Sequence, residues 1–298
     1  MDFSVIGQKI KELRKQMGLS QGELADGICT QAQISKIEKG DVFPYATTLY
    51  LISQRLGVDV NYFFDIGMTP RLDYIQEVEN QLRLARHKLD FDTIRQIIKA
   101  EEKNPLFTQN KKNYQLLLWH KGIYEYFKNK DLQTALTLIE EALSLTRQSE
   151  KIYSERELDV MVSKAVFYVE EKLYEEAYST YQGALKYLEN FPYLTDNTIK
   201  LRLIYNFARL LTRLHQYDES ISYCNEAIKW CIEHDLLFSL GELHYHTGYN
   251  YELKGDYKSA SFYLTKSLQV FELQRDDRFV PFIEKKLNQW KSENKISS

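Results

Sequence analysis

Glycine, proline and cysteine are scarce in this sequence. Its 298 residues include 12 glycines, 5 prolines and 3 cysteines, and average proteins use glycine and proline more often. A chain with so few of both has few turns and little material for glycine-rich phosphate-binding loops. This composition favours an all-α fold. The length is that of about two domains.

The cysteines do not form a disulfide framework. Cys29 is far from the others in sequence, and Cys224 and Cys231 lie seven positions apart on one expected helix. Seven residues of helix rise roughly 10 Å, which is too far for a disulfide. We expect buried thiols in a reducing compartment.

Long apolar runs and an excess of one charge are also missing. No stretch approaches the roughly 18 uninterrupted apolar residues of a membrane span, and the first 16 residues lack an apolar segment of signal-peptide length. We therefore expect a cytoplasmic protein with no membrane partner. The 39 basic and 42 acidic residues nearly balance, which argues against bulk binding of nucleic acid through a positively charged surface.

Aromatic residues, by contrast, are plentiful, with 22 tyrosines and 15 phenylalanines. They suffice to fill a large core or to line a groove. The first helix that we predict spans residues 5–16, with Ile6, Ile10 and Leu13 on one face, and Gly18 ends it.

Two short helices should follow. Ser20 and Glu23 form a capping box that begins a helix running to about Ile28. Thr30 can cap the next helix, which covers residues 31–38. A helix, a tight turn and a second short helix are the arrangement that places a recognition helix in the DNA major groove.

Over about 60 residues, the blocks GLSQGELA, SKIEKG and LGVDVNYF resemble the lambda-repressor-like (Cro/C1, or XRE) class of helix-turn-helix domains. The resemblance implies a DNA-binding domain over residues 1–66. It implies that Ile34 and Ile37 face the core and that Arg14 and Glu38 form an internal ion pair. Lys9 and Arg55 are phosphate contacts or merely solvated charges. The implied DNA contacts are Gln21, Gln31, Ala32, Gln33, Ser35, Lys36 and Lys39.

The charge of this domain limits how it can bind DNA. Residues 1–66 hold seven basic and eight acidic side chains, whereas phosphate contacts supply much of the affinity of a DNA-binding protein. A single copy should bind weakly. We expect a homodimer on a two-fold symmetric operator in double-stranded DNA, with dimerisation supplied by the rest of the chain.

The remaining residues repeat a helical pattern. Thr69 and Pro70 predict a helix start, and a linker helix within residues 67–86 should merge into the repeats. Equivalent small or apolar residues at positions 94, 135, 177, 220 and 260 are 40 to 43 residues apart. Such a period is typical of a stacked helical array.

These segments resemble degenerate tetratricopeptide repeats with lengthened helices, and HTGYNYELKGDYKSASFYL fits that pattern best. We predict an α-solenoid of about five such repeats over residues 70–298. A helix near residues 279–291 would form its cap.

The first helix of each repeat should face the concave side and bind ligands. In the fourth repeat, Arg202, Asn206, Arg209 and Arg213 fall on one helical face. Arginine forks suit carboxylates and an asparagine amide suits a peptide backbone; the alternative is an ordinary solvated face. Counting by repeat gives the other candidates, His120, Lys121, Tyr124, Ser163, Tyr205, Tyr245, His246 and Tyr249.

A helix-turn-helix domain followed by five long repeats resembles the RNPP group of peptide-sensing regulators and the related Rgg proteins. The resemblance implies a transcriptional regulator controlled by a short quorum-sensing peptide in the concave groove. It implies that Asn206 holds the peptide backbone, and it adds His87 and Phe167 as peptide-site positions that differ from the usual pattern. Peptide binding would change repeat curvature or dimer geometry, with the helix at residues 70–86 transmitting the change.

Two alternatives remain open. The repeats could bind a protein partner or only dimerise, or the protein could be a phosphatase-type regulator like the Rap and NprR members of the group. The sequence holds no H-E-x-x-H, P-loop, C-x-x-C or G-x-S-x-G motif, so we expect no enzyme activity. His244 and His246 do not face one site on a helix, and we expect neither metal nor cofactor.

Overall fold

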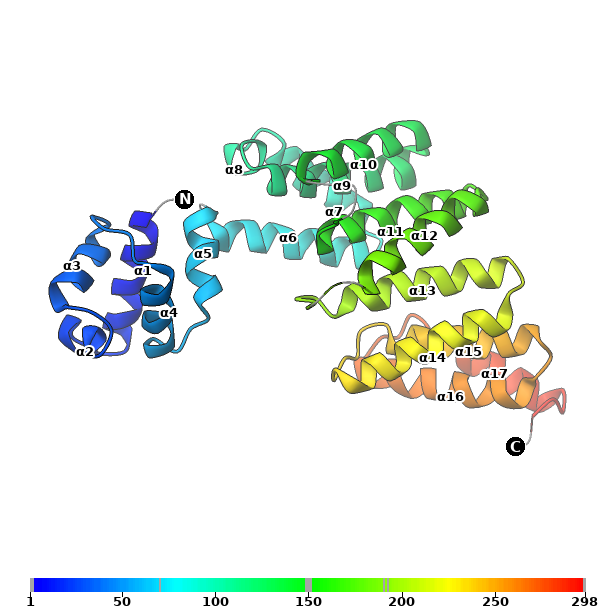
Figure 1. The fold of residues 1–298 in the computed structure, drawn as a ribbon. Helices are drawn as coiled ribbons and strands as arrows, with labels where there is room; N and C mark the ends of the chain where they lie inside the picture. Colours follow the sequence, from blue (N-terminus) through cyan, green and yellow to red (C-terminus); the bar gives the residue numbers. More distant parts are fainter. Residues whose placement is uncertain (1–2, 70, 148–151, 190, 192, 297–298) are drawn as a thin grey trace. The chain divides into compact units, whose positions relative to one another are not determined.

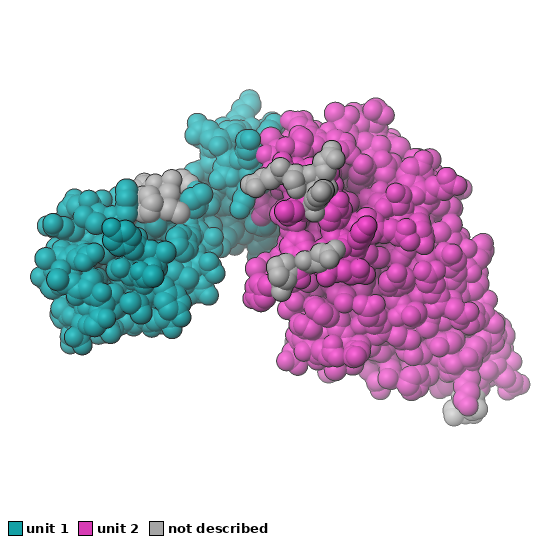
Figure 2. All heavy atoms as spheres, viewed as in Figure 1, with its two compact units in different colours: residues 1–114 teal, residues 115–298 magenta. Residues whose placement is uncertain are grey.

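The computed structural model describes residues 3–69, 71–147, 152–189, 191 and 193–296 (Figure 1). Within these ranges the chain forms 17 helices and no strand. The predicted all-α fold is confirmed. It divides into two compact units, residues 1–114 and residues 115–298 (Figure 2).

The helix-turn-helix domain lies in the first unit and has five helices. Both predicted caps are present, because Ser20 and Glu23 form a capping box and the Thr30 side chain accepts from the Gln33 amide. The second helix ends at Ala25, earlier than predicted, and the chain then turns. The helices are α1 (Phe3–Gln16), α2 (Gln21–Ala25), α3 (Gln31–Lys39), α4 (Ala46–Arg55) and α5 (Val60–Met68).

The start of the next helix differs from the prediction. Thr69 is the C-cap of α5, since its backbone N–H donates to the Asp65 carbonyl, and Pro70 lies outside the described residues. Helix α6 begins at Leu72, after Arg71 adopts a left-handed conformation with φ of 54°. The chain therefore changes direction at Arg71.

The first helix pair, α6 (Leu72–His87) and α7 (Phe91–Glu101), is followed by the short helix α8 (Pro105–Thr108). All three belong to the compact unit that holds the helix-turn-helix domain. The predicted helix-turn-helix domain of residues 1–66 lies wholly within this unit. The unit boundary falls inside the next helix, α9.

Four further helix pairs and a terminal helix follow, which confirms five pairs and a cap. The small or apolar residues at the repeat positions Ile94, Ala135, Ala177, Ser220 and Ala260 are fully buried, as expected where two helices pack closely. The helices are α9 (Lys111–Asn129), α10 (Leu132–Thr146), α11 (Glu155–Glu170), α12 (Tyr174–Glu189), α13 (Thr198–Arg213), α14 (Tyr217–Glu233), α15 (Leu240–Leu253), α16 (Tyr257–Gln274) and α17 (Val280–Ser292).

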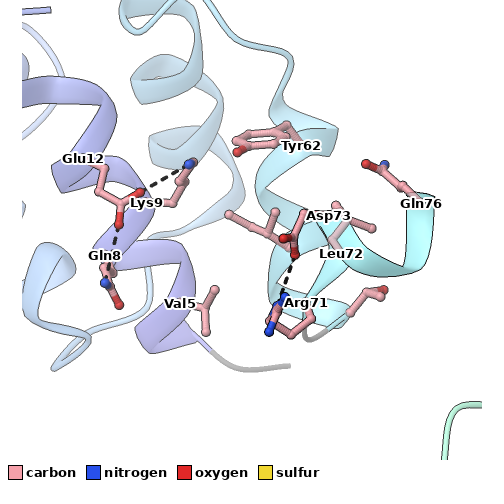
Figure 3. Close-up of a pocket in the computed structure, with 11 residues that line it drawn as sticks. Val5, Gln8, Lys9, Glu12, Tyr62, Arg71, Leu72, Asp73 and Gln76 are labelled. Atoms are coloured by element: carbon pink, nitrogen blue, oxygen red, sulfur yellow. Dashed lines mark hydrogen bonds and ion pairs between the residues drawn. The ribbon is translucent and has the colours of Figure 1, made fainter. Parts of the chain in front are cut away.

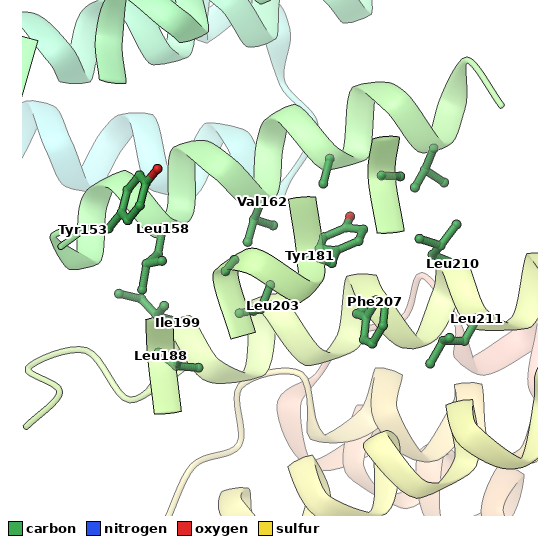
Figure 4. Packing of buried hydrophobic residues seen from close by; sticks show 14 residues of the cluster. Tyr153, Leu158, Val162, Tyr181, Leu188, Ile199, Leu203, Phe207, Leu210 and Leu211 are labelled. Atoms are coloured by element: carbon green, nitrogen blue, oxygen red, sulfur yellow. The ribbon is translucent and has the colours of Figure 1, made fainter. Parts of the chain in front are cut away.

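A continuous apolar core joins α11, α12 and α13. Val162, Tyr181 and Phe207 meet between the helices, and Leu158 and Leu203 extend the cluster (Figure 4). Burial of apolar surface contributes about 25 cal/mol per Å², so this cluster fixes the spacing of α11 and α13. Their outward faces are thereby held in a defined register.

None of the described helices combines the length and apolar character needed to cross a membrane. Cys29, Cys224 and Cys231 are free thiols. Burial raises the pKa of Cys224 to about 12, as expected of an unreactive core thiol.

Candidate DNA-binding helix and ligand-binding face

Helix α3 has one buried face and one polar face. Ile34 and Ile37 are buried in the domain core, which confirms their predicted direction. Glu38 is buried as well, and the other α3 side chains point outward: Gln31, Ala32, Lys36 and Lys39 are exposed, and Gln33 and Ser35 are partly exposed. Glutamine can bond adenine in a bidentate manner, so this face has the chemistry of a recognition surface.

A buried ion pair holds α3 against α1. Arg14 Nε lies 2.5 Å from Glu38 Oε1, and Arg14 Nη2 lies 3.0 Å from Oε2, which confirms the predicted pair. Gln21 Nε2 donates to Glu38 Oε2 at 2.9 Å, and Gln31 Nε2 donates to Gln21 Oε1 at 2.7 Å. The network therefore links α1, α2 and α3 and fixes the orientation of α3.

The network also sets the ionisation of Glu38. Burial by itself raises the pKa of this carboxyl, but the hydrogen bonds from Arg14 and Gln21 outweigh burial, and the pKa lies below its ordinary value. Glu38 is thus held as a carboxylate.

Two lysines that the sequence analysis missed lie close to α3. Lys11 and Lys15, with Lys39, line a hollow of about 440 Å³ beside α1 and the end of α3. Their i, i+4 spacing on α1 was the available signal. Glu12 and Glu38 line the same hollow, but Glu38 is already bonded to Arg14.

The other two predicted phosphate contacts have structural partners. Lys9 pairs with Glu12 at 3.2 Å. Arg55 Nη1 donates to the carbonyl oxygens of Glu23, Leu24 and Asp26 at the end of α2. Arg55 therefore caps a helix C-terminus, where a cation is favourable.

A second pocket of the first unit, about 480 Å³, lies among α1, α5 and the start of α6 (Figure 3). Its cations are matched by anions: Lys9 pairs with Glu12, and Arg71 pairs with Asp73 at 3.5 Å. This pocket therefore offers no surplus positive charge to a phosphate.

In the second unit, polar side chains of α11 and α13 form two interhelical ion pairs. Arg202 donates to both carboxylate oxygens of Asp159 at 2.7 and 2.8 Å and to Asp196 at 3.0 Å. Arg213 donates to Glu170 at 2.9 Å and to the Val169 carbonyl. Two predicted peptide contacts thus already bind side chains of their own unit.

Asn206 and Arg209 lie on α13 between Arg202 and Arg213, the arginines of these two ion pairs. Asn206 Nδ2 donates to the Arg202 carbonyl at 2.8 Å, and Arg209 Nη1 donates to Asn206 Oδ1 at 3.4 Å. The Arg209 guanidinium lies 5.9 Å from the centre of the Tyr205 ring. The side chains of Tyr205, Asn206 and Arg209 are partly exposed, and we name these three residues the α13 triad.

Helix α15 places its predicted residues differently. His246 is buried, with Nε2 2.8 Å from Thr212 Oγ1, and burial lowers its pKa to about 4. Tyr245 and Tyr249 are partly exposed, with parallel rings 6.4 Å apart. The two tyrosines are accessible to a ligand, whereas the neutral imidazole connects α13 and α15.

Two other predicted residues are also in the interior. Phe167 stacks on Tyr126 at 4.5 Å, and His120 Nδ1 lies 2.9 Å from the Leu116 carbonyl oxygen; both side chains are buried. Direct contact of Phe167, His120 or His246 with a peptide would require the helices to separate, because each is packed among neighbouring helices.

The rest of the predicted peptide set is accessible. Lys121, Tyr124 and Ser163 are partly exposed, and Ser163 Oγ accepts from Trp119 Nε1 at 2.9 Å. His87 is exposed at the end of α6, in the first unit. Among the described residues, no group of three His, Cys, Asp or Glu side chains is arranged to hold a metal ion.

Comparison with known proteins gives two family matches. Residues 79–290 match the RNPP family C-terminal domain, and residues 10–63 match a helix-turn-helix domain. No curated protein sequence matches.

Several solved structures are similar in fold. PlcR of Bacillus thuringiensis, in complex with the peptide PapR7 and DNA, is 20% identical with a TM-score of 0.83, over 99% of this chain and 100% of that one. ComR of S. thermophilus, in complex with DNA and its signalling peptide ComS, is 17% identical with a TM-score of 0.64, over 95% and 99%. The SHP pheromone receptor Rgg2 of Streptococcus dysgalactiae is 15% identical with a TM-score of 0.64, again over 95% and 99%. At these identities the likeness establishes the fold.

Proposed function

This chain belongs to the RNPP family, and on that premise we propose that it is a DNA-binding transcriptional regulator controlled by a short signalling peptide. The observation that carries the proposal is the presence, in one chain, of this family domain and of a helix-turn-helix domain with an exposed polar face on α3. Two proteins of similar fold, PlcR and ComR, have been solved with DNA and a peptide bound.

DNA binding is assigned to the outer face of α3. The Arg14–Glu38 pair and Gln21 fix the direction of this helix, so its glutamines are pre-oriented, which lowers the entropic cost of binding. We propose base contacts by Gln31, Ala32, Gln33, Ser35 and Lys36, and phosphate contacts by Gln21, Lys39, Lys11 and Lys15. The protein would bind a two-fold symmetric operator as a homodimer and act in the cytoplasm.

Peptide binding is assigned to the α13 triad and its accessible neighbours. The Asn206 amide can bond an extended backbone, and Tyr245 and Tyr249 offer ring faces and hydroxyl groups. Ser163, Lys121 and Tyr124 extend the surface toward α9. Peptide and DNA would be coupled by about 1–3 kcal/mol, the usual size of allosteric effects. We propose no catalytic role for this face.

A selection experiment tests the proposal. The full-length protein is mixed with a randomised duplex DNA pool, with and without the small-peptide fraction of the producing organism's culture medium. Enrichment of a two-fold symmetric site that changes with the peptide fraction is the expected result. If a symmetric site is enriched equally with and without every peptide fraction, the result would instead favour repeats that bind a protein partner or only dimerise.

Two variants assign the result to the proposed surface. Gln33→Ala should lose the enriched sequence, while Gln269→Ala, an exposed glutamine of α16, should keep it. If no site is enriched by the wild-type protein under either condition, the DNA-binding proposal is wrong.

A further inference from the structure

We infer that Arg209 is a carboxylate receptor, and that the peptide bound by this protein presents a carboxylate at the middle of α13. This inference rests on the proposed function and specifies the chemistry of its ligand. The carboxylate could be the peptide C-terminus or the side chain of an aspartate or glutamate. Both have the same two-oxygen geometry, which an arginine fork matches in a bidentate manner.

Two ion pairs define the register between α11 and α13. The two ion pairs that join these helices, Asp159–Arg202 and Glu170–Arg213, both link residues 43 positions apart. The two pairs are eleven positions apart on each helix, about three turns. The same offset of 43 matches Ser163 with Asn206 and Val166 with Arg209.

Arg209 is the exception among the three arginines of this face. Arg202 and Arg213 each have a carboxylate from α11. At the level of Arg209, α11 carries Val166, which has no charge. In the described part of the chain Arg209 forms no ion pair, and its guanidinium contacts Asn206 Oδ1 and the Tyr205 ring.

Other titratable groups lie near the Arg209 guanidinium. Its charge acts on Tyr181, Tyr205 and His246, and burial keeps His246 neutral by lowering its pKa to about 4. On α15, Glu252 is paired with Lys286 of α17 at 2.5 Å, and Glu242 acts on Tyr205 from a position near the start of that helix. Glu170, the acidic residue at the far end of α11, is held by Arg213.

Arg209 is therefore a partly buried cation whose surroundings are aromatic, amide or apolar. A charge is costly to withdraw from water without a counter-ion, so an incoming carboxylate would gain a charge-assisted bond that the chain itself does not supply. Arg202 and Arg213 cannot offer this bond without giving up an ion pair. The Asn206 amide lies next to the same position and could bond the adjacent peptide group.

Synthetic libraries can test the inference without knowledge of the natural peptide. Three heptapeptide libraries are made: one without Asp or Glu and with a free C-terminal carboxylate, one of equal composition ending in a carboxamide, and one amidated with a single Asp at a scanned position. Full-length wild-type protein, Arg209→Gln and Arg275→Gln are used to capture peptides, which are identified by mass spectrometry. Arg275 is an exposed arginine at the end of α16 and is the matched control.

We expect wild type and Arg275→Gln to retain about 10-fold or more peptide from one of the two carboxylate libraries than from the neutral library. This ratio is the usual gain from a charged hydrogen bond. Arg209→Gln should remove that preference, with its melting temperature checked against wild type. Preference for the free-acid library identifies the C-terminus, and preference for the Asp library identifies a side chain.

Two other outcomes would overturn the inference. If wild type retains peptides with no preference for a carboxylate, or if Arg209→Gln keeps the preference, the carboxylate receptor is wrong while peptide binding stands. If wild type retains no peptide from any library, the peptide-responsive function fails together with the inference.

Discussion

Glu38 has an uncommon environment for a single residue, since a buried carboxylate accepts hydrogen bonds from Arg14 and Gln21 and lies at the centre of the DNA-binding domain. Glu38→Gln would leave Arg14 buried without a counter-charge. Breaking a buried pair on one side costs about 3 kcal/mol or more. We expect that loss in the free energy of unfolding of the first unit, measured with denaturant. Glu12→Gln, whose partner Lys9 is more exposed, should cost less than about 1 kcal/mol.

The depressed pKa of Glu38 also predicts acid sensitivity. Its stabilising contribution is fully present above the ordinary carboxyl pKa, about 4.3, and is lost as pH falls through the lower folded value. Glu38→Gln should lack this part of the acid dependence. Equal stability of Glu38→Gln and Glu12→Gln at neutral pH would contradict the role of the pair.

Two buried histidines make the stability of the second unit depend on pH, in a range above the one in which Glu38 acts. Burial lowers the pKa of His244 and of His246 to about 4, whereas an unfolded histidine titrates near 6.5. The unfolded chain therefore binds more protons between these values, and stability should fall as pH decreases from about 6.5 to 4. The loss is up to about 3 kcal/mol per histidine.

Thermal unfolding against pH measures this effect. His246→Gln, which keeps an amide beside Thr212, should remove about half of the histidine-dependent slope, and His244→Gln combined with His246→Gln should remove nearly all of it. A double variant as acid-sensitive as wild type between pH 6.5 and 4 would show that other groups carry the dependence.

Between elements, the crossing of α1 and α3 depends on Gly7. A Cβ added at Gly7 would lie 2.0 Å from the Ile37 carbonyl oxygen, so the helices must move apart. We expect Gly7→Ala to destabilise the first unit by about 3 kcal/mol, at the upper end of overpacking effects. DNA affinity should fall with it because α3 is displaced.

Gly22→Ala is the matched control for the helix crossing. The nearest atom to a Cβ at Gly22 is Ser20 Oγ at 3.8 Å, and alanine is favoured over glycine in a helix by up to about 1 kcal/mol. This variant should be as stable as wild type or more stable. If Gly7→Ala melts at the same temperature as Gly22→Ala, the close approach of the two helices is wrong.

Local signals predicted most elements, and the family resemblance predicted the Arg14–Glu38 pair, whereas the long-range ion pairs of the second unit escaped prediction. The caps at Ser20 and Thr30 and the repeat positions Ala177 and Ala260 depend on neighbours in sequence, and the structure confirms them. The α6 start was misplaced because Thr69 is still bonded within α5.

The candidate ligand face was predicted only as one set of side chains. Its helical spacing placed Arg202, Asn206, Arg209 and Arg213 together, but could not separate paired from unpaired arginines. The partners Asp159 and Glu170 lie 43 residues away, and contacts across such a separation depend on the register of two packed helices. Likewise, burial of His246 and Phe167 depends on helices that are distant in sequence.

For the whole molecule, the near-neutral charge of residues 1–66 predicts that two copies are needed for useful DNA affinity. With the full-length protein, a duplex with two symmetric half-sites should bind at least about 100-fold more tightly than a duplex with one, because the second contact is effectively intramolecular. Fluorescence anisotropy with the two duplexes measures the ratio. Equal affinities would contradict binding as a dimer.

The salt dependence of DNA affinity then tests which lysines contact the DNA phosphates. If Lys15 contacts one phosphate in each protomer, Lys15→Gln should reduce the slope of log affinity against log salt by about 1.8, since each phosphate contact contributes about 0.9. Lys258→Gln, an exposed lysine of α16, should leave the slope unchanged. The binding constant is measured at four or more salt concentrations on the same symmetric duplex. A slope unaffected by Lys15→Gln would exclude Lys15 from the phosphate contacts, and the neighbouring Lys11 and Lys39 would then be tested in the same way, because all three line one hollow beside α3.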